Sequence, residues 1–234
     1  MSTIDNMILR IRRGDSPLAR ILSDIYRWIE VQRVPEIPAT RMLYGALYRI
    51  HDAYEAVREQ VAGKLIYEPM VRARFSVGDR VIVSSLPYVR GHARVTVGDD
   101  CRLGHFAVTS GRFVDDPELV IGNGVSISSG VGFVVNKRII IGDRVGIAGR
   151  SWISDSDGHP AELSRRLAGE QITEGDVEPL IIEPDVWIGH SVHLLKGANI
   201  GRGAVVAAGS VVTRPVPAGA LAMGVPARIV TRPW

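Results

Sequence analysis

An aliphatic residue recurs at every sixth position through most of this chain, usually followed by glycine and with a small residue four places later. The clearest run is Ile182, Ile188, Leu194, Ile200, Val206 and Val212. A period of six matches neither the 3.6-residue repeat of a helix nor the two-residue alternation of a strand. It is typical of a parallel β-helix, in which short strands alternate with turns and the same position points inward at each corner. The repeat therefore predicts an all-β solenoid.

Earlier parts of the chain keep the same step, in runs from Val71 to Val95, Val97 to Thr109, Ile121 to Phe133 and Ile141 to Ile153. We therefore place the β-helix at residues 65–215. Shifts of phase mark loops, and residues 110–117 read as an irregular coil. The longest interruption, residues 154–180, is rich in charged and small residues. A long excursion from a regular solenoid is usually functional or disordered, so this loop is the candidate site.

Composition supports one main domain with a smaller appendage. Hydrophobic residues make up 46% of the 234 residues but aromatic residues only 6%, which suits the narrow interior of a solenoid. The single cysteine, Cys101, excludes an intrachain disulfide framework. It occupies the small-residue position of the repeat, which favours a buried core thiol over a nucleophile.

Charge and hydropathy limit which cellular compartment and which binding partners are expected. The net charge is +3 with scattered basic residues, a pattern that does not favour nucleic acid. No apolar run approaches the ~18–20 residues that span a bilayer. Arg10, Arg12 and Arg13 follow a short apolar pair, the reverse of the order in a secretory signal. We expect a cytoplasmic protein.

Residues 1–64 lack the repeat and predict two amphipathic helices. Ser16 and Pro17 suit the start of the first, and Thr40 can cap the second after the breaks at Pro35 and Pro38. The first helix carries Ile21, Ile25, Trp28 and Ile29 on one face, and the second carries Leu43, Leu47, Ile50, Tyr54, Val57 and Val61. We expect these faces to cover the open first coil, with a membrane surface as the alternative. Residues 216–234 are expected to form a tail beyond the coil.

His159 is the candidate catalytic residue of the long loop. Gly158 and Pro160 flank it and fix a turn. An imidazole can take a proton from a hydroxyl or an amine at neutral pH. Asp157 or Asp155 could orient the ring, although a backbone carbonyl would serve as well. A plain surface histidine is the alternative. A zinc site needs three converging ligands, whereas His190 and His193 form only a pair three residues apart, so no metal is expected.

The last coils carry the residues that resemble a known family. Residues 184–213, with Trp187-Ile-Gly and Ala207-Ala-Gly-Ser, followed by Gly224-Val-Pro-Ala-Arg, resemble the hexapeptide-repeat acyltransferases. The similarity is to the branch of galactoside, maltose and polysaccharide O-acetyltransferases, and it covers residues 65–230. It implies a left-handed parallel β-helix, a homotrimer, and acetyl-CoA as donor in a groove between two subunits.

The resemblance also implies roles for individual residues. His159 corresponds to the catalytic histidine of the family. The positions that correspond to its donor-binding residues are Trp187, Gly189, His190, Ala208, Thr213, Arg214 and Arg228. Asn136 and Asp155 are candidates for contact with the acceptor.

The resemblance predicts direct acetyl transfer to a hydroxyl of a sugar or glycan precursor. Two alternatives stay open. One is N-acetylation of an amino sugar or its nucleotide, which needs less help from a base. The other is a catalytically silent β-helix that serves as a scaffold, although such a chain should have lost His159 or Trp187.

Overall fold

The computed structural model describes residues 16–31, 38–111 and 115–230. The expectations for residues 1–15, for Pro35, for residues 112–114 of the irregular coil, and for the side chains of Trp28, Ile29 and Thr40 lie outside what it describes. The chain divides into two compact units, Met1–Tyr54 and Glu55–Trp234. The whole β-helix belongs to the second unit.

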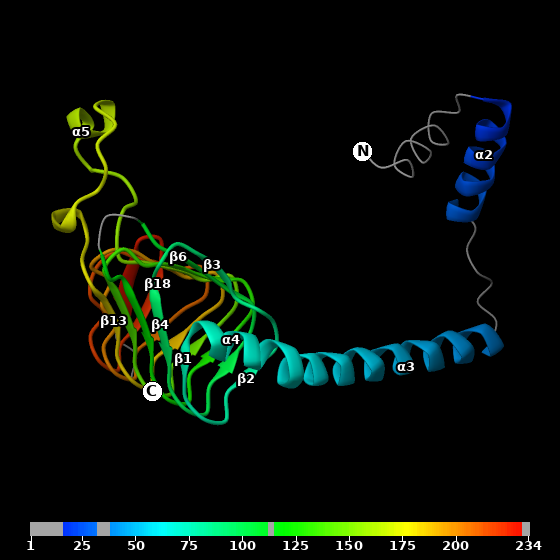
Figure 1. The fold of residues 1–234 in the computed structure, drawn as a ribbon, viewed down its shortest axis with the longest axis horizontal. Coiled ribbons are helices and arrows are strands. Elements are labelled where there is room, and N and C mark those ends of the chain that lie inside the picture. The colour runs from blue at the N-terminus through cyan, green and yellow to red at the C-terminus, as the bar shows by residue number, and fades with distance from the viewer. Residues whose placement is uncertain (1–15, 32–37, 112–114, 231–234) are drawn as a thin grey trace. The chain divides into compact units, whose positions relative to one another are not determined.

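Three sheets form the walls of the β-helix (Figure 1). Face A contains β1 (Ser76–Val77), β4 (Arg94–Val97), β7 (Glu118–Ile121), β10 (Arg138–Ile141) and β13 (Leu180–Ile182). Face B contains β2 (Ile82–Val83), β5 (Arg102–Leu103), β8 (Ser126–Ile127), β11 (Gly146–Ile147), β14 (Trp187–Ile188), β16 (Val205–Val206), β18 (Leu221–Gly224) and β19 (Ala227–Val230). Face C contains β3 (Tyr88–Arg90), β6 (Phe106–Thr109), β9 (Val131–Val134), β12 (Trp152–Ser154), β15 (His193–Leu194) and β17 (Val211–Val212).

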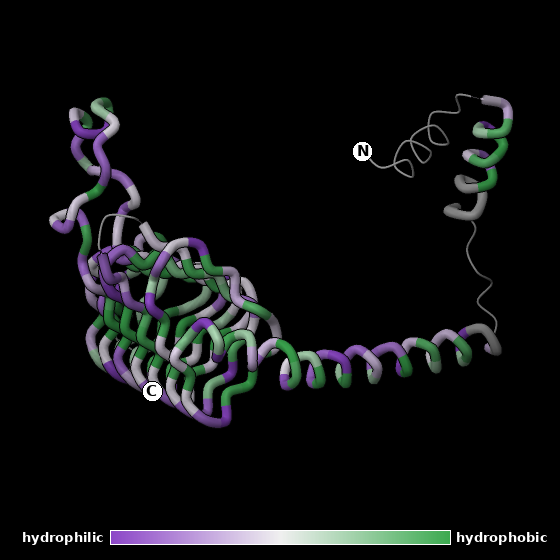
Figure 2. The backbone as a smooth tube through the Cα atoms, viewed as in Figure 1, coloured by the Kyte–Doolittle hydropathy of each residue, from purple (hydrophilic) through white to green (hydrophobic). Residues whose placement is uncertain are grey.

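Every paired strand is parallel to its neighbours except β19, which turns back antiparallel on β18. On face B, Ile147 is paired with Ile188 and Ile188 with Val206, so successive repeats stack in register. The predicted solenoid is thus confirmed, and the parallel coil is consistent with the left-handed β-helix that the resemblance implies. In Figure 2 the hydrophobic residues recur as bands across successive coils.

The aliphatic residues at every sixth position are the inward-facing residues of the coils. Ile182, Ile188 and Leu194 are completely buried, one on each face of the same coil. Face C departs from the beat in its second strand, where Val108 is buried and Thr109 is not. The rings of Phe106 and Phe133 meet edge to face here, with centroids 6.0 Å apart. A four-residue strand with two inward positions gives these rings room.

Hydrogen bonds between side chain and backbone join successive coils at the corner between faces A and B. The amide of Asp79 donates to Asp99 Oδ1 at 2.7 Å, and the amide of Asp99 donates to Asn123 Oδ1 at 2.9 Å. The amide of Asn123 donates in turn to Asp143 Oδ1 at 2.7 Å. Turn amides that no strand can satisfy therefore find acceptors one coil later.

The helical region continues past residue 64, to Arg74. It consists of α2 (Pro17–Val31), α3 (Pro38–Ala62), the π-helix η1 (Gly63–Tyr67) and α4 (Glu68–Arg74). Val71, which the sequence assigns to the six-residue beat, lies on α4 and is buried with Phe75 against the first coil. The first coil is therefore capped by the segment that follows α3. Within the second unit, the side chains of Val57 and Val61 on the expected covering face of α3 are at least half exposed. That the helical faces cover the coil stays a prediction.

The C-terminal segment continues the coil instead of leaving it. Val216 forms a parallel bridge with Ile200, and Ala222 is completely buried on β18, six residues later. The prolines after Val212 thus interrupt the sequence pattern without ending the coil, because the side chains of Pro215 and Pro217 face outward. β18 and β19 close the far end of face B as a hairpin.

The long interruption is an excursion between β12 and β13, as predicted. It contains the short helix α5 (Leu163–Leu167) and the 3-10 turn η2 (Glu174–Asp176), and it projects beyond the coils (Figure 1). Asp155 fixes its start, since the buried carboxylate accepts hydrogen bonds from the backbone amides of Asn136, Lys137 and Arg138 at 2.7–3.1 Å. Burial raises the pKa of Asp155, and the same amides oppose that rise.

Removal of this carboxylate should destabilise the β-helix. In Asp155→Ala, three backbone amides lose their acceptor, and we expect a loss of about 3 kcal/mol in the free energy of unfolding. Urea unfolding followed by circular dichroism measures this loss. Glu162→Ala, at an exposed position of the same loop, is the control and should change stability by less than about 0.5 kcal/mol. A loss below about 1 kcal/mol in Asp155→Ala would contradict the assigned role.

Candidate active site

His159 lies at a bend in the outgoing segment of the loop, five residues after the end of β12, with an exposed side chain. Gly158 has a φ of +77°, a left-handed conformation that glycine adopts without strain. Pro160 is buried, and Arg166 Nη1 donates to its carbonyl oxygen at 2.9 Å and also to that of Ala161. The imidazole is therefore presented to solvent from a backbone segment that is itself held in place.

The loop has buried apolar side chains of its own and is held together by ion pairs. Ile172 and Val177 are buried within it. Arg165 Nη1 and Nη2 bind both oxygens of Asp176 at 2.9 and 2.8 Å, and its Nε donates to Glu170 at 3.0 Å. Lys137, on the preceding coil, donates to Glu174 at 2.8 Å. This order is what a loop needs in order to present a catalytic group in one position.

The two aspartates expected beside His159 have other partners. Asp155 is bound to the coil as described above. The Asp157 carboxylate lies 2.6 Å from the Nζ of Lys196, on the turn after β15. A role for Asp157 in orienting the ring stays a prediction. The sequence offered no signal for Lys196, because its partner Asp157 lies in the long loop, far away along the chain.

Asn136, the other candidate for acceptor contact, is buried within the same network as Asp155. Its Oδ1 accepts from the amide of Gly111 at 3.0 Å, and its Nδ2 donates to Ser156 Oγ at 2.5 Å. These contacts place both residues in the support of the loop. Their role in acceptor binding stays a prediction.

Four of the expected donor-binding residues lie together on face B and the corner that follows it. Trp187 opens β14 with 60% of its surface exposed. Gly189 stacks directly on Ala208 of the next coil, where a Cβ on Gly189 would come within 2.6 Å of the Ala208 amide nitrogen. His190 is exposed beside them, and its carbonyl accepts from the amide of Gly209 at 2.8 Å. Only glycine at position 189 lets the two coils approach this closely.

The other three expected donor-binding residues lie further along the coil, and their side chains are all exposed. Thr213 and Arg214 follow β17, at the corner after face C, whereas Arg228 lies on β19 opposite Met223. The amide of Gly224, in the β18–β19 hairpin, donates to Ser210 Oγ at 3.1 Å and so holds the hairpin against the last full coil. A shared role of Arg214 and Arg228 in phosphate binding stays a prediction.

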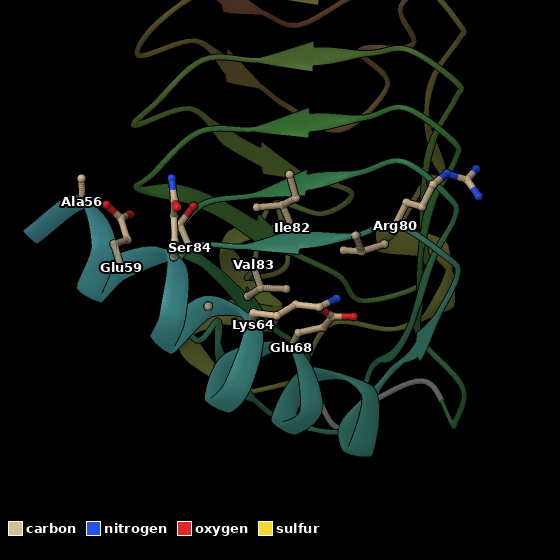
Figure 3. A pocket seen from close by; sticks show the side chains of 11 residues that line it. Ala56, Glu59, Lys64, Glu68, Arg80, Ile82, Val83 and Ser84 are labelled. Carbon is tan, nitrogen blue, oxygen red and sulfur yellow. The ribbon is translucent and has the colours of Figure 1, made fainter. Parts of the chain in front are cut away.

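A separate hollow of about 660 Å³ lies at the first coil, between the end of α3 and β2 (Figure 3). Lys64 donates to Glu68 at 2.7 Å along its wall, beside Ile82 and Val83. Arg80 lies at its other side. None of the predicted site residues lines it, and three strands separate β2 from β14 in face B.

Cys101 is completely buried, as predicted, and burial raises the pKa of its thiol. Within the described residues, no group of three or more His, Cys, Asp or Glu side chains is placed to hold a metal ion. Over the same part of the chain, the helices are too short or too polar to cross a membrane.

Fold and site together define a hexapeptide-repeat solenoid with one histidine-bearing loop. Residues 179–214 match the bacterial transferase hexapeptide (six repeats) family. A putative acetyltransferase of Saccharomyces cerevisiae, YJL218W, is 34% identical over 51% of this chain and 63% of its own length. Serine acetyltransferase of Salmonella typhimurium is 32% identical over 79% of this chain and 66% of its own length.

Among solved structures, the polySia-specific acetyltransferase NeuO is 26% identical, with a TM-score of 0.51 over 68% of this chain and 81% of that one. The chain spans just under two thirds of the length of the two sequence relatives. The matched repeats and the coil that they build are similar to those of the hexapeptide-repeat transferases.

The ion pairs of the loop predict a response to acid. The guanidinium of Arg165, aided by the Thr173 amide, holds the pKa of Asp176 well below its usual range. A lowered pKa means that the pair contributes fully above the ordinary aspartate value of about 4, and that its contribution is lost as the pH falls below it. We expect the amide NMR signals of residues 163–177 to stay constant above about pH 4 and to lose chemical-shift dispersion only as the pH falls well below it, where Asp176 takes up its proton. Signals of β13 should not change first; if they do, the pair does not order the loop.

Proposed function

We propose that this chain transfers an acetyl group from acetyl-CoA to a hydroxyl of a sugar or glycan precursor, with His159 as general base. The observation that carries the proposal is the exposed imidazole on a loop held firmly on both sides of it. The relatives support the reaction type, since the sequence relatives and NeuO alike are named as acetyltransferases. The match to a polySia-specific enzyme supports a glycan acceptor and the polysaccharide branch of the family.

The chemistry needs one proton carrier and no covalent intermediate on the protein. The imidazole of His159 takes the proton of the acceptor hydroxyl as the oxygen attacks the thioester carbonyl. The tetrahedral intermediate collapses, the carbon–sulfur bond breaks, and the thiolate leaves with the proton that the imidazolium returns. A backbone N–H directed at the oxyanion would contribute about 3–4 kcal/mol.

The donor is proposed to lie along the corner after face B. There the stacked Gly189 and Ala208 leave a flat backbone strip, and Trp187 rises beside it with an exposed indole. A narrow pantetheine arm fits a strip without large side chains. Thr213, Arg214 and Arg228 are proposed to hold the nucleotide and its phosphates, with charge-assisted hydrogen bonds from the two arginines.

A homotrimer is proposed as the working form, with each site between two subunits. His159 is open to solvent in the single chain, and a second subunit would exclude water from it and strengthen the electrostatic interactions there. The proposed setting is cytoplasmic, because acetyl-CoA is supplied there.

A second acceptor is favoured by one observation. Serine acetyltransferase is similar over 79% of this chain, so the hydroxyl of serine is an alternative to that of a sugar. Release of free thiol from acetyl-CoA, measured against serine, sugars, nucleotide sugars and amino sugars, separates the candidates. Thiol release with amino sugars alone would indicate N-acetylation, and the absence of release with every acceptor would favour the scaffold alternative.

Loss of the base should abolish most of the turnover. We expect His159→Ala to lower kcat at least ~100-fold while acetyl-CoA still binds, because a general base accelerates proton transfer by about that factor. Thiol release gives kcat, and calorimetry gives donor binding. His105→Ala, at another exposed histidine, is the matched control and should keep full activity. Comparable activity in His159→Ala would remove the assigned role.

Arg228 should recognise the terminal phosphate of the donor. We expect Arg228→Ala to weaken the binding of acetyl-CoA about 10-fold, consistent with the loss of a charge-assisted hydrogen bond. The binding of dephospho-acetyl-CoA should stay nearly unchanged. Competition with each compound measures the difference. Arg202→Ala, at an exposed arginine of the corner between faces A and B, is the control. Equal losses for both donors would show that Arg228 does not contact this phosphate.

A further inference from the structure

The loop joins the β-helix through a narrow neck. Ser156 on the outgoing strand forms an antiparallel bridge with Val177 on the returning strand, and the amide of Glu178 donates to the carbonyl of Asp155 at 3.0 Å. The preceding coil holds the outgoing strand through the contacts of Asp155 and Asn136 described above. Those contacts end before Asp157, so a separate restraint is needed to place His159.

Lys196 supplies a restraint from the following coil. It lies on the turn between β15 and β16, and its Nζ is 2.6 Å from Asp157 Oδ2 and 3.3 Å from the carbonyl oxygen of Asp176. One ammonium group therefore binds the outgoing segment of the loop and the end of η2 together. Gly197, the next residue, lies against the neck as well, because a Cβ there would be 3.1 Å from Glu178 Oε2.

We propose that Lys196 is a positioning residue for His159, an inference that rests on the proposed function. Asp157 is two residues before the histidine, and Arg166 holds the carbonyl of Pro160 directly after it. The segment 157–160 is thus restrained on one side from within the loop and on the other side from the coil. Lys196 provides the second restraint and so connects the imidazole to the rigid part of the molecule.

The alternative is an ordinary surface ion pair, which contributes little to structure or stability. Two features distinguish this pair. The Lys196 side chain is only 25% exposed, and its ammonium binds acceptors on two different segments of the loop, at Asp157 and in η2. An ammonium can do so because it has three donors that rotate freely on a flexible stem. The role of Asp157 is then to connect Lys196 to the loop backbone, in place of the direct contact with the ring expected from the sequence.

The test compares four variants of the full chain by thiol release: Lys196→Met, Lys196→Arg, Asp157→Asn and the double variant Lys196→Met with Asp157→Asn. We expect Lys196→Met to lower kcat about 10- to 100-fold, the scale of a misplaced catalytic group. The KM for acetyl-CoA should stay within about twofold. Lys196→Arg should recover at least half of the activity. The double variant should be no slower than either single one, because both remove the same link.

Lys137→Met is the matched control. Lys137 also joins the coil to the loop, through Glu174 of η2, and its side chain is comparably exposed at 34%. Its ammonium does not bind the segment 157–160 in the described structure. We expect its kcat to stay within about twofold of the native value. A similar loss in Lys137→Met and Lys196→Met would show a general loosening of the loop, and would overturn the specific role of Lys196.

Hydrogen exchange provides a readout that does not depend on turnover. In Lys196→Met, amides of residues 156–160 should exchange faster while those of β13 keep their protection. Unchanged exchange there together with unchanged kcat would refute the proposal. If Lys196→Met does not fold, Asp157→Asn tests the same link. Should His159→Ala keep its activity, the proposed function fails first; should only His159→Ala lose activity and Lys196→Met keep it, this inference alone fails.

Discussion

Register between successive coils is the constraint on which the rest of the molecule depends. Each short strand pairs its backbone groups with the coils before and after it, so inward positions stack on one another and an apolar position in one coil is followed by an apolar position in the next. Ile147, Ile188 and Val206 are one such column, fully buried or nearly so. A segment that cannot follow this register has to leave at a corner, which is where the loop with His159 leaves.

A coil of this kind is rigid but offers little chemistry of its own. The described faces consist mostly of short strands, and most of these strands present only one or two side chains to solvent. The loop adds to the coil a histidine on a turn, with charged groups arranged around it. It keeps its order because its restraints come from three places: Asp155 at its start, Arg165 and Arg166 within it, and Lys137 and Lys196 from the coils on either side. The loop and the solenoid thus function as one unit.

Sequence expectations failed where a local pattern had two structural meanings. Val71 keeps the six-residue step, yet it belongs to a helix, because any aliphatic residue that packs on the first coil fits the count. The prolines after Val212 suggested that the coil ends there. Because they face outward, they interrupt the sequence pattern without breaking the coil, which continues to Ala222. Val71 and Phe75, which follow α3 in the chain, cap the first coil.

The sequence by itself determined the solenoid, the place of its interruption and the histidine within it, because a repeat is a local property that can be counted along the chain. Only the tertiary structure decided which charges surround that histidine. The sequence is equally compatible with either aspartate beside the His159 ring. In the folded chain, the amides of residues 136–138 bind Asp155, and Lys196 binds Asp157. Such pairs form between different coils, and no spacing in the sequence records them, since the loop between the partners has no fixed period.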